Sequence, residues 1–165
     1  MVAFQIREVK KFMAKLLGQN DFDEFCVNEA EIMMAAGYKI NGHRNKNFYT
    51  KEEWDEMLES EFLRWEEIRP MVFQMIRGSK TPTGMTIVLR LPLRKTEVLL
   101  RESGAGLRME DVTGLYLNLK FSEGALMAVT ATGLVTFLPD KQLERAWDAW
   151  VKEFLKAKEI EFDEV

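Results

Sequence analysis

The apolar residues near the start of the chain recur at the spacing of an α-helix. They stand at Ile6, Val9, Phe12, Met13, Leu16 and Leu17. Gly18 follows them and is a favourable residue just past a helix end, so the pattern predicts a short amphipathic helix over residues 6–17. Residues 25–40 are rich in small and apolar side chains and are expected to be extended, with the pair Asn41-Gly42 as a hairpin signal.

A second helix is predicted from residue 50, where Thr50-Lys51-Glu52-Glu53 fits a capping box. An apolar stripe follows at spacings of 4, 4 and 3 residues: Trp54, Leu58, Phe62 and Trp65. Because the residue before a proline disfavours the helical conformation, Arg69-Pro70 is expected to end this helix near Ile68.

The second half of the chain predicts antiparallel strands. Residues 71–76 and 85–91 are expected to form a hairpin around the polar loop 77–84, and residues 115–121, 125–131 and 134–137 a three-stranded meander. Between them, residues 96–103 favour a short helix, although Val98-Leu99-Leu100 also suits a strand.

The last predicted helix begins near Pro139-Asp140 and carries an apolar stripe through Leu143, Trp147, Trp150 and Phe154. This stripe fits either the core or an interface with another subunit. The expected fold is a single α+β domain over residues 1–165, with antiparallel strands in 25–48, 71–91 and 114–137 covered by the Trp54 and Trp147 helices. Two similar strand-to-helix junctions, 47–52 and 136–141, suggest a weak internal ββ-α duplication, with chance similarity of such junctions as the alternative.

Composition places the chain among ordinary globular proteins. Of its 165 residues 47% are hydrophobic and 30% are charged, which excludes disordered, collagen-like and low-complexity classes. A single cysteine, the lack of a signal sequence and the lack of an 18-residue apolar run predict a cytoplasmic protein that does not contact a membrane.

The net charge of −4 conceals an uneven distribution along the chain. Residues 1–63 carry −4, residues 64–108 carry +5 and residues 109–165 carry −5. Arg69, Arg77, Lys80 and Thr81 lie at the ends of the expected central hairpin, where they would bind a phosphate group, a carboxylate or a nucleic acid. The alternative is that this basic segment packs between the acidic flanks.

Catalytic chemistry finds little support in the residues. The only histidine, His43, lies in a polar turn, Cys26 lies among apolar residues, and the carboxylates of residues 52–61 fit a solvated helix face. Gly78-Ser79-Lys80-Thr81 lacks the first glycine of a phosphate loop, and Gly104-Ala105-Gly106 lacks the third glycine of a dinucleotide fingerprint. No catalytic residue, metal site or cofactor is therefore predicted, and an enzyme is disfavoured.

Several segments together resemble a known family. They are Phe12-Met13 with Leu16-Leu17, Asp21-Phe22-Asp23, Tyr38-Lys39-Ile40-Asn41-Gly42, Phe48-Tyr49, Trp65 with Arg69-Pro70, Ile76-Arg77-Gly78-Ser79-Lys80-Thr81-Pro82, Gly114-Leu115-Tyr116-Leu117-Asn118, and Thr136-Phe137 through Trp147-Asp148. As a set they resemble a domain-of-unknown-function family of small bacterial proteins, the one numbered 5721. The resemblance implies a cytoplasmic bacterial protein and brings no activity and no catalytic residue with it.

The principal functional hypothesis is a non-catalytic binding or interaction module. Its partner is unknown, and a protein partner or a second copy of the chain is included among the candidates. One alternative is a binder of nucleic acid or of a phosphate ligand through the basic central hairpin. A second is a small enzyme whose carboxylates converge from elements distant in sequence.

Overall fold

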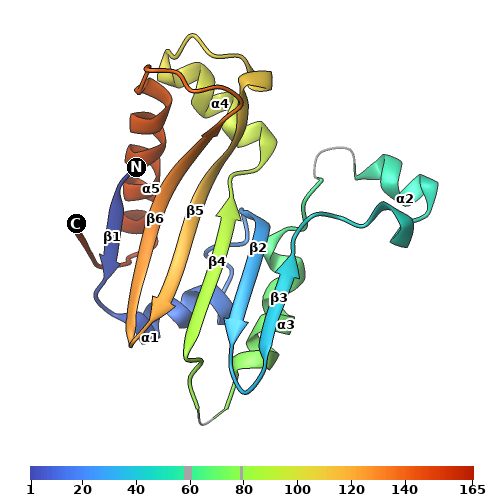
Figure 1. Cartoon of the computed structure of the whole chain (residues 1–165), viewed down its shortest axis with the longest axis vertical. Coiled ribbons are helices and arrows are strands. Elements are labelled where there is room, and N and C mark those ends of the chain that lie inside the picture. The colour runs from blue at the N-terminus through green and yellow to red at the C-terminus, as the bar shows by residue number, and fades with distance from the viewer. Residues whose placement is uncertain (58–60, 79) are drawn as a thin grey trace.

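The computed structural model describes residues 1–57, 61–78 and 80–165. Within these residues seven strands form one antiparallel sheet (Figure 1): β1 (Ala3–Ile6), β2 (Cys26–Met33), β3 (Gly37–Asn41), β4 (Gly84–Arg90), β5 (Val112–Ser122), β6 (Ala125–Leu134) and β7 (Phe162–Glu164). Their order across the sheet is β3-β2-β4-β5-β6-β1-β7. The chain is thus an α+β domain on an antiparallel sheet, as predicted.

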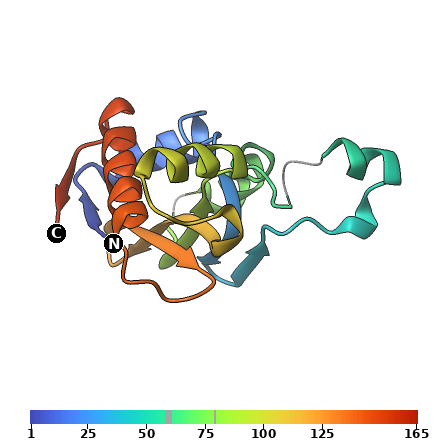
Figure 2. The same cartoon turned by 90° about the horizontal axis from the view of Figure 1, so that it is seen from above.

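Helices cover one face of this sheet. They are α1 (Val9–Met13), a π-helical segment (Ala14–Gly18), α3 (Trp65–Ile76), α4 (Leu93–Ser103) and α5 (Gln142–Ala157). Helix α2 (Lys51–Glu56) instead projects beyond the β3 edge (Figures 1 and 2). Two short 3₁₀ segments, Lys46–Phe48 and Met109–Asp111, complete the elements. We call the side of the sheet opposite the helices the outer face.

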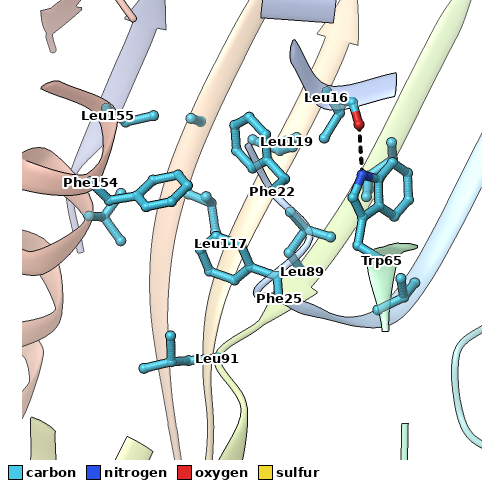
Figure 3. Close-up of a cluster of buried hydrophobic side chains, with 14 of the residues drawn as sticks. Leu16, Phe22, Phe25, Trp65, Leu89, Leu91, Leu117, Leu119, Phe154 and Leu155 are labelled. Atoms are coloured by element: carbon cyan, nitrogen blue, oxygen red, sulfur yellow. Dashed lines mark hydrogen bonds between the residues drawn. The ribbon is translucent and has the colours of Figure 1, made fainter. Parts of the chain in front are cut away.

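The core lies between the sheet and the helices (Figure 3). Phe22 and Phe25 precede β2, are fully buried, and place their ring centroids 5.4 and 5.2 Å from that of Phe154 on α5. Trp65, at the start of α3, is also fully buried, and its indole N–H donates to the carbonyl oxygen of Leu16 at 2.7 Å. Aromatic side chains thus join α3, α5 and the first helical segment over the sheet.

Several elements form where the periodicity predicts them. The hairpin of β5 and β6 and the strand β4 follow the alternation of apolar and polar residues, and α4 replaces the strand that Val98-Leu99-Leu100 also suited. The first helix ends at Gly18 as expected, although Ile6 belongs to β1. The stripe of α5 faces the core, because Trp147 is fully buried and its indole N–H donates to the carbonyl oxygen of Tyr116 at 3.0 Å.

The predicted helix from residue 50 to 68 and the strand over 71–76 are wrong. Helix α2 ends at Glu56, the chain is extended around Phe62, and α3 runs from Trp65 to Ile76 through Pro70; Leu58 lies outside the described residues. Trp65, Ile68 and Val72 are buried at spacings of 3 and 4, which is a helical stripe. Proline has no N–H to donate to the carbonyl group one helical turn earlier. Because Pro70 is exposed, water can donate to that carbonyl group instead.

Three other expectations are corrected by the sheet. The β2–β3 turn lies at residues 34–36 rather than at Asn41-Gly42, since Met33 pairs with Gly37. Residues 134–137 add no third strand: β6 ends at Leu134, pairs with β1 on its other side, and is followed by a loop with an exposed Phe137. The Trp54 helix does not cover the sheet, and the partners of β4 are β2 and β5 rather than residues 71–76. The internal duplication stays a hypothesis.

Candidate functional site

Two cavities adjoin at Phe62, which lines both of them, and the first lies at the end of the sheet where β4 leads into α4. The first cavity, of about 250 Å³, is bounded by the ends of β4 and β5, the start of α4 and the segment at residues 61–62. The second, of about 550 Å³, lies over the outer face of β2 and β3. Among the described residues, these two cavities bring charged and aromatic side chains together, including Arg90, Phe62 and His43.

Arg90 is the fixed cation of the first cavity. Its guanidinium carbon lies 3.9 Å from the ring centroid of Phe62 and 5.5 Å from that of Tyr116, distances typical of cation–π contacts. Nη1 donates to Oδ1 of Asn28 at 3.3 Å, and Nη2 donates to the carbonyl oxygen of Thr113 at 3.0 Å. No carboxylate of the described residues lies within ion-pair distance of Arg90, so three of its five N–H groups find no acceptor there.

The alternation of β4 explains why Arg90 faces this cavity. Met85, Ile87 and Leu89 point into the core, so Arg90 points to the outer face. The register places it opposite Cys26 of β2 and Tyr116 of β5. The Tyr116 ring lies over Gly114, where a Cβ atom would come within 2.7 Å of it. A missing side chain on β5 therefore makes room for the tyrosine beside Arg90.

Phe62 is held over Arg90 by a pair of extended segments, residues 42–44 and 61–64, which we call the neck. The Arg44 N–H donates to the carbonyl oxygen of Glu61 and the Leu63 N–H to that of Gly42, both at 2.8 Å. The Val27 N–H donates to the carbonyl oxygen of Leu63 at 2.8 Å and attaches the neck to β2. The neck thus fixes the position of Phe62 relative to the sheet.

The neck carries a projection, residues 45–57, which we call the arm and which contains α2. Its base is tied to α3 by Arg44, whose Nη1 and Nη2 donate to the two carboxylate oxygens of Glu67 at 3.2 and 2.9 Å. Burial alone would lower the pKa of Arg44 and raise the pKa of Glu67. The hydrogen bonds and charges that the two residues share outweigh burial, together with a hydrogen bond from Arg44 to Tyr49 and one from the Arg64 N–H to Glu67. The pKa of Arg44 is therefore raised and the pKa of Glu67 is lowered.

The first cavity also has a negatively charged group. Glu61 is exposed at its lining, and among the described residues no ion pair or hydrogen bond engages its carboxylate. The rest of the lining is largely aliphatic and includes Leu91, Leu93, Met109 and Val112. The cavity therefore combines one cation, one anion and an apolar wall, with the two charges not paired to each other.

The second cavity contains His43 and two carboxylates. Glu29 and Glu31 are successive outward residues of β2, and the His43 ring contacts Phe62 edge-on at a centroid distance of 5.2 Å. The His43 Nδ1 lies 3.2 Å from the carbonyl oxygen of Arg44. Across residues 1–57, 61–78 and 80–165, no three histidine, cysteine or carboxylate side chains are grouped closely enough to hold a metal ion.

The residues predicted to bind an anion are dispersed by the helical conformation of α3. Arg69 lies within the helix, where Nε and Nη2 donate to the carboxylate of Asp23 at 2.9 and 2.8 Å, and these bonds raise its pKa against the smaller effect of burial. Arg77 caps the same helix eight residues later, roughly 12 Å along its axis. Lys80 and Thr81 are exposed in the following loop. Arg69 is therefore occupied by an ion pair.

Arg69→Met is expected to reduce the free energy of unfolding by about 1–3 kcal/mol, because it leaves the half-buried Asp23 carboxylate without its partner. Arg77→Met is the matched control and should change stability by less than about 0.5 kcal/mol, since Arg77 is exposed. Urea unfolding followed by circular dichroism measures both. Equal stability of the two variants would contradict the structural role of Arg69.

Arg90, Phe62 and Glu61 are not among the site residues that the sequence predicts. The signal for Arg90 is that it is the last outward residue of an alternating strand. The helix predicted from residue 50 includes Phe62 and places Glu61 on its acidic face. Both assignments failed because residues 61–64 are extended.

Comparisons with known proteins give one match. Among the described residues, no helix is long and apolar enough to cross a membrane. No curated protein and no solved structure matches the chain. The model of a family of unknown function, DUF5721, matches residues 15–163, in agreement with the resemblance of the sequence segments. This match spans most of the chain, and the protein therefore belongs to this family of unknown function.

Proposed function

We propose that this protein is a non-catalytic binding module that holds a small ligand in the first cavity. The observation that carries the proposal is Arg90, a cation fixed by Phe62, Asn28 and Thr113 that has no carboxylate partner among the described residues. A charge held in one position with free donors binds a ligand oxygen without first having to be ordered.

The size of the cavity favours a compact ligand. About 250 Å³ lies just below the usual range of roughly 300–1,000 Å³ for small-molecule sites. The largely aliphatic lining favours a ligand with an apolar portion, and the one cation orients it. The buried Cys26 suits a reducing compartment, so we place the module in the cytoplasm.

The test is a screen of compact carboxylic acids, amines and amino acids against the ¹⁵N-labelled protein by NMR. A true ligand is expected to shift the amide signals of Phe62, Arg90 and Thr113. Its affinity should fall at least about tenfold in Arg90→Met, because a charge-assisted hydrogen bond is lost. Lys120→Met, an exposed outer-face residue of β5, is the matched control and should bind normally.

Two results would overturn this proposal. The first is a screen in which no compound shifts those amides. The second is a ligand whose affinity is the same for the wild-type protein and for Arg90→Met.

A phosphate site at Arg77, Lys80 and Thr81 is a second candidate. Arg77 and Lys80 are exposed on either side of a short loop, and no carboxylate of the described residues pairs with them. Inorganic phosphate and a short single-stranded oligonucleotide are the probes. The double variant Arg77→Met with Lys80→Met should weaken their binding and flatten its salt dependence. Unchanged binding in this variant would exclude the site.

A further inference from the structure

We propose that the ligand of the first cavity is a free α-amino acid with an apolar side chain. This inference rests on the proposed function and specifies its ligand. Its basis is the combination of Arg90, Glu61 and an aliphatic wall around one compact cavity.

Arg90 supplies the site for the carboxylate. A guanidinium group offers planar, paired N–H donors that match the two oxygens of a carboxylate. The groups already bonded to Arg90 are an amide oxygen and a main-chain carbonyl oxygen, which fix its plane and leave its positive charge uncompensated. A ligand carboxylate would supply the missing negative charge.

Glu61 supplies the site for the ammonium group. Glu61 lines the same cavity and is exposed, and its carboxylate has no cationic partner among the described residues. A ligand with only a negative charge would meet repulsion from Glu61, and a ligand with only a positive charge would meet repulsion from Arg90. A zwitterion is the ligand charge pattern that satisfies both residues.

The aliphatic wall supplies the site for the side chain. Leu91, Leu93, Met109 and Val112 line the cavity, and Leu93 is largely exposed at present, so a bound side chain would remove apolar surface from water. The modest volume fits a side chain of the size of leucine or methionine better than a peptide or a nucleotide. Charge pattern, lining and size therefore point to the same class of ligand.

The experiment compares L-leucine and L-methionine with three analogues that each lack one feature. These are 4-methylpentanoic acid without the ammonium group, 3-methylbutylamine without the carboxylate, and glycine without the side chain. Isothermal titration calorimetry and amide shifts at Phe62, Arg90 and Thr113 measure binding. Each analogue is expected to bind at least about tenfold more weakly than leucine.

Two variants separate the roles of the charges. Glu61→Gln should reduce the affinity for leucine at least about tenfold. The affinity for 4-methylpentanoic acid should stay the same or rise, because the carboxylate no longer meets repulsion from Glu61. Arg90→Met should reduce the affinity for leucine and leave the affinity for 3-methylbutylamine unchanged. Glu123→Gln, at the exposed turn between β5 and β6, is the control and should change nothing. Glu61 is exposed, so its variant tests the inference even if Arg90→Met folds poorly.

The outcomes distinguish this inference from the proposed function. If 4-methylpentanoic acid binds the cavity as well as leucine does, the assignment of an amino acid as the ligand is wrong, but the first cavity is still a binding site. The same conclusion follows if other compounds of the screen shift the cavity amides and no amino acid does. If no compound shifts them, the inference and the proposed function both fail.

Discussion

Trp65→Ala is expected to reduce the free energy of unfolding by about 3–5 kcal/mol, the largest effect of any substitution considered. The side chain is fully buried at the start of α3, so its removal leaves a cavity in the core beside Leu16 (Figure 3). The carbonyl oxygen of Leu16 also loses the indole donor at 2.7 Å. Urea unfolding monitored by circular dichroism measures the change.

Two further variants test the role of Trp65. Trp65→Phe keeps a six-membered ring but loses the indole donor and part of the ring volume, so it should cost about 1–3 kcal/mol. Trp54→Ala removes a half-buried tryptophan from the arm and should cost clearly less than Trp65→Ala, since Trp54 lies outside the core. If Trp54→Ala were as destabilising as Trp65→Ala, the assignment of Trp65 to the core would be wrong.

Gly42→Ala is expected to detach the neck from β2 and to cost at least about 2 kcal/mol. A Cβ atom there would overlap the carbonyl oxygen of Val27 and lie 2.6 Å from its carbonyl carbon. Both are backbone atoms, so the strand cannot yield as a flexible side chain would. The hydrogen bonds from the Gly42 N–H to Asn28 and from the Leu63 N–H to Gly42 would be lost, each contributing about 1 kcal/mol.

Hydrogen exchange at the Leu63 and Arg44 amides, together with urea unfolding, measures this effect. Gly106→Ala is the matched control, because a Cβ atom at Gly106 meets nothing within 4 Å. Exchange at Leu63 as slow in Gly42→Ala as in the wild-type protein would show that the neck does not depend on this close approach. Phe62 should leave Arg90 in the variant, so ligand binding should weaken as well.

The sequence predicts those elements in which apolar and polar residues repeat at a regular spacing. Strands β4, β5 and β6 alternate regularly, and α5 carries an uninterrupted stripe through Trp147, so periodicity alone identifies them. Pro70 misled the assignment of α3, because the rule for prolines describes local preference and the burial of Trp65, Ile68 and Val72 outweighs it. The Asn41-Gly42 pair misled in a similar way: Gly42 is needed for close approach to β2 rather than for a turn.

The candidate site was harder to predict, since it depends on strand order. Arg90, Phe62 and Glu61 meet because β2 lies between β3 and β4 and the neck passes along its end. No local signal in a single sequence gives that order. The basic segment of residues 64–108 does contain Arg90. The expected hairpin instead favours Arg69, Arg77, Lys80 and Thr81, and this expectation is wrong because residues 71–76 belong to α3.

The neck has a consequence for how this chain tolerates insertion and deletion. The bond between the Arg44 N–H and the Glu61 carbonyl brings both ends of the intervening sixteen-residue stretch as close together as the ends of a tight turn. The arm is therefore a side branch of the chain, and a change in its length would leave the connectivity of the seven-stranded sheet intact. Such a branch is a place where members of one family can acquire different partners without rebuilding their common core.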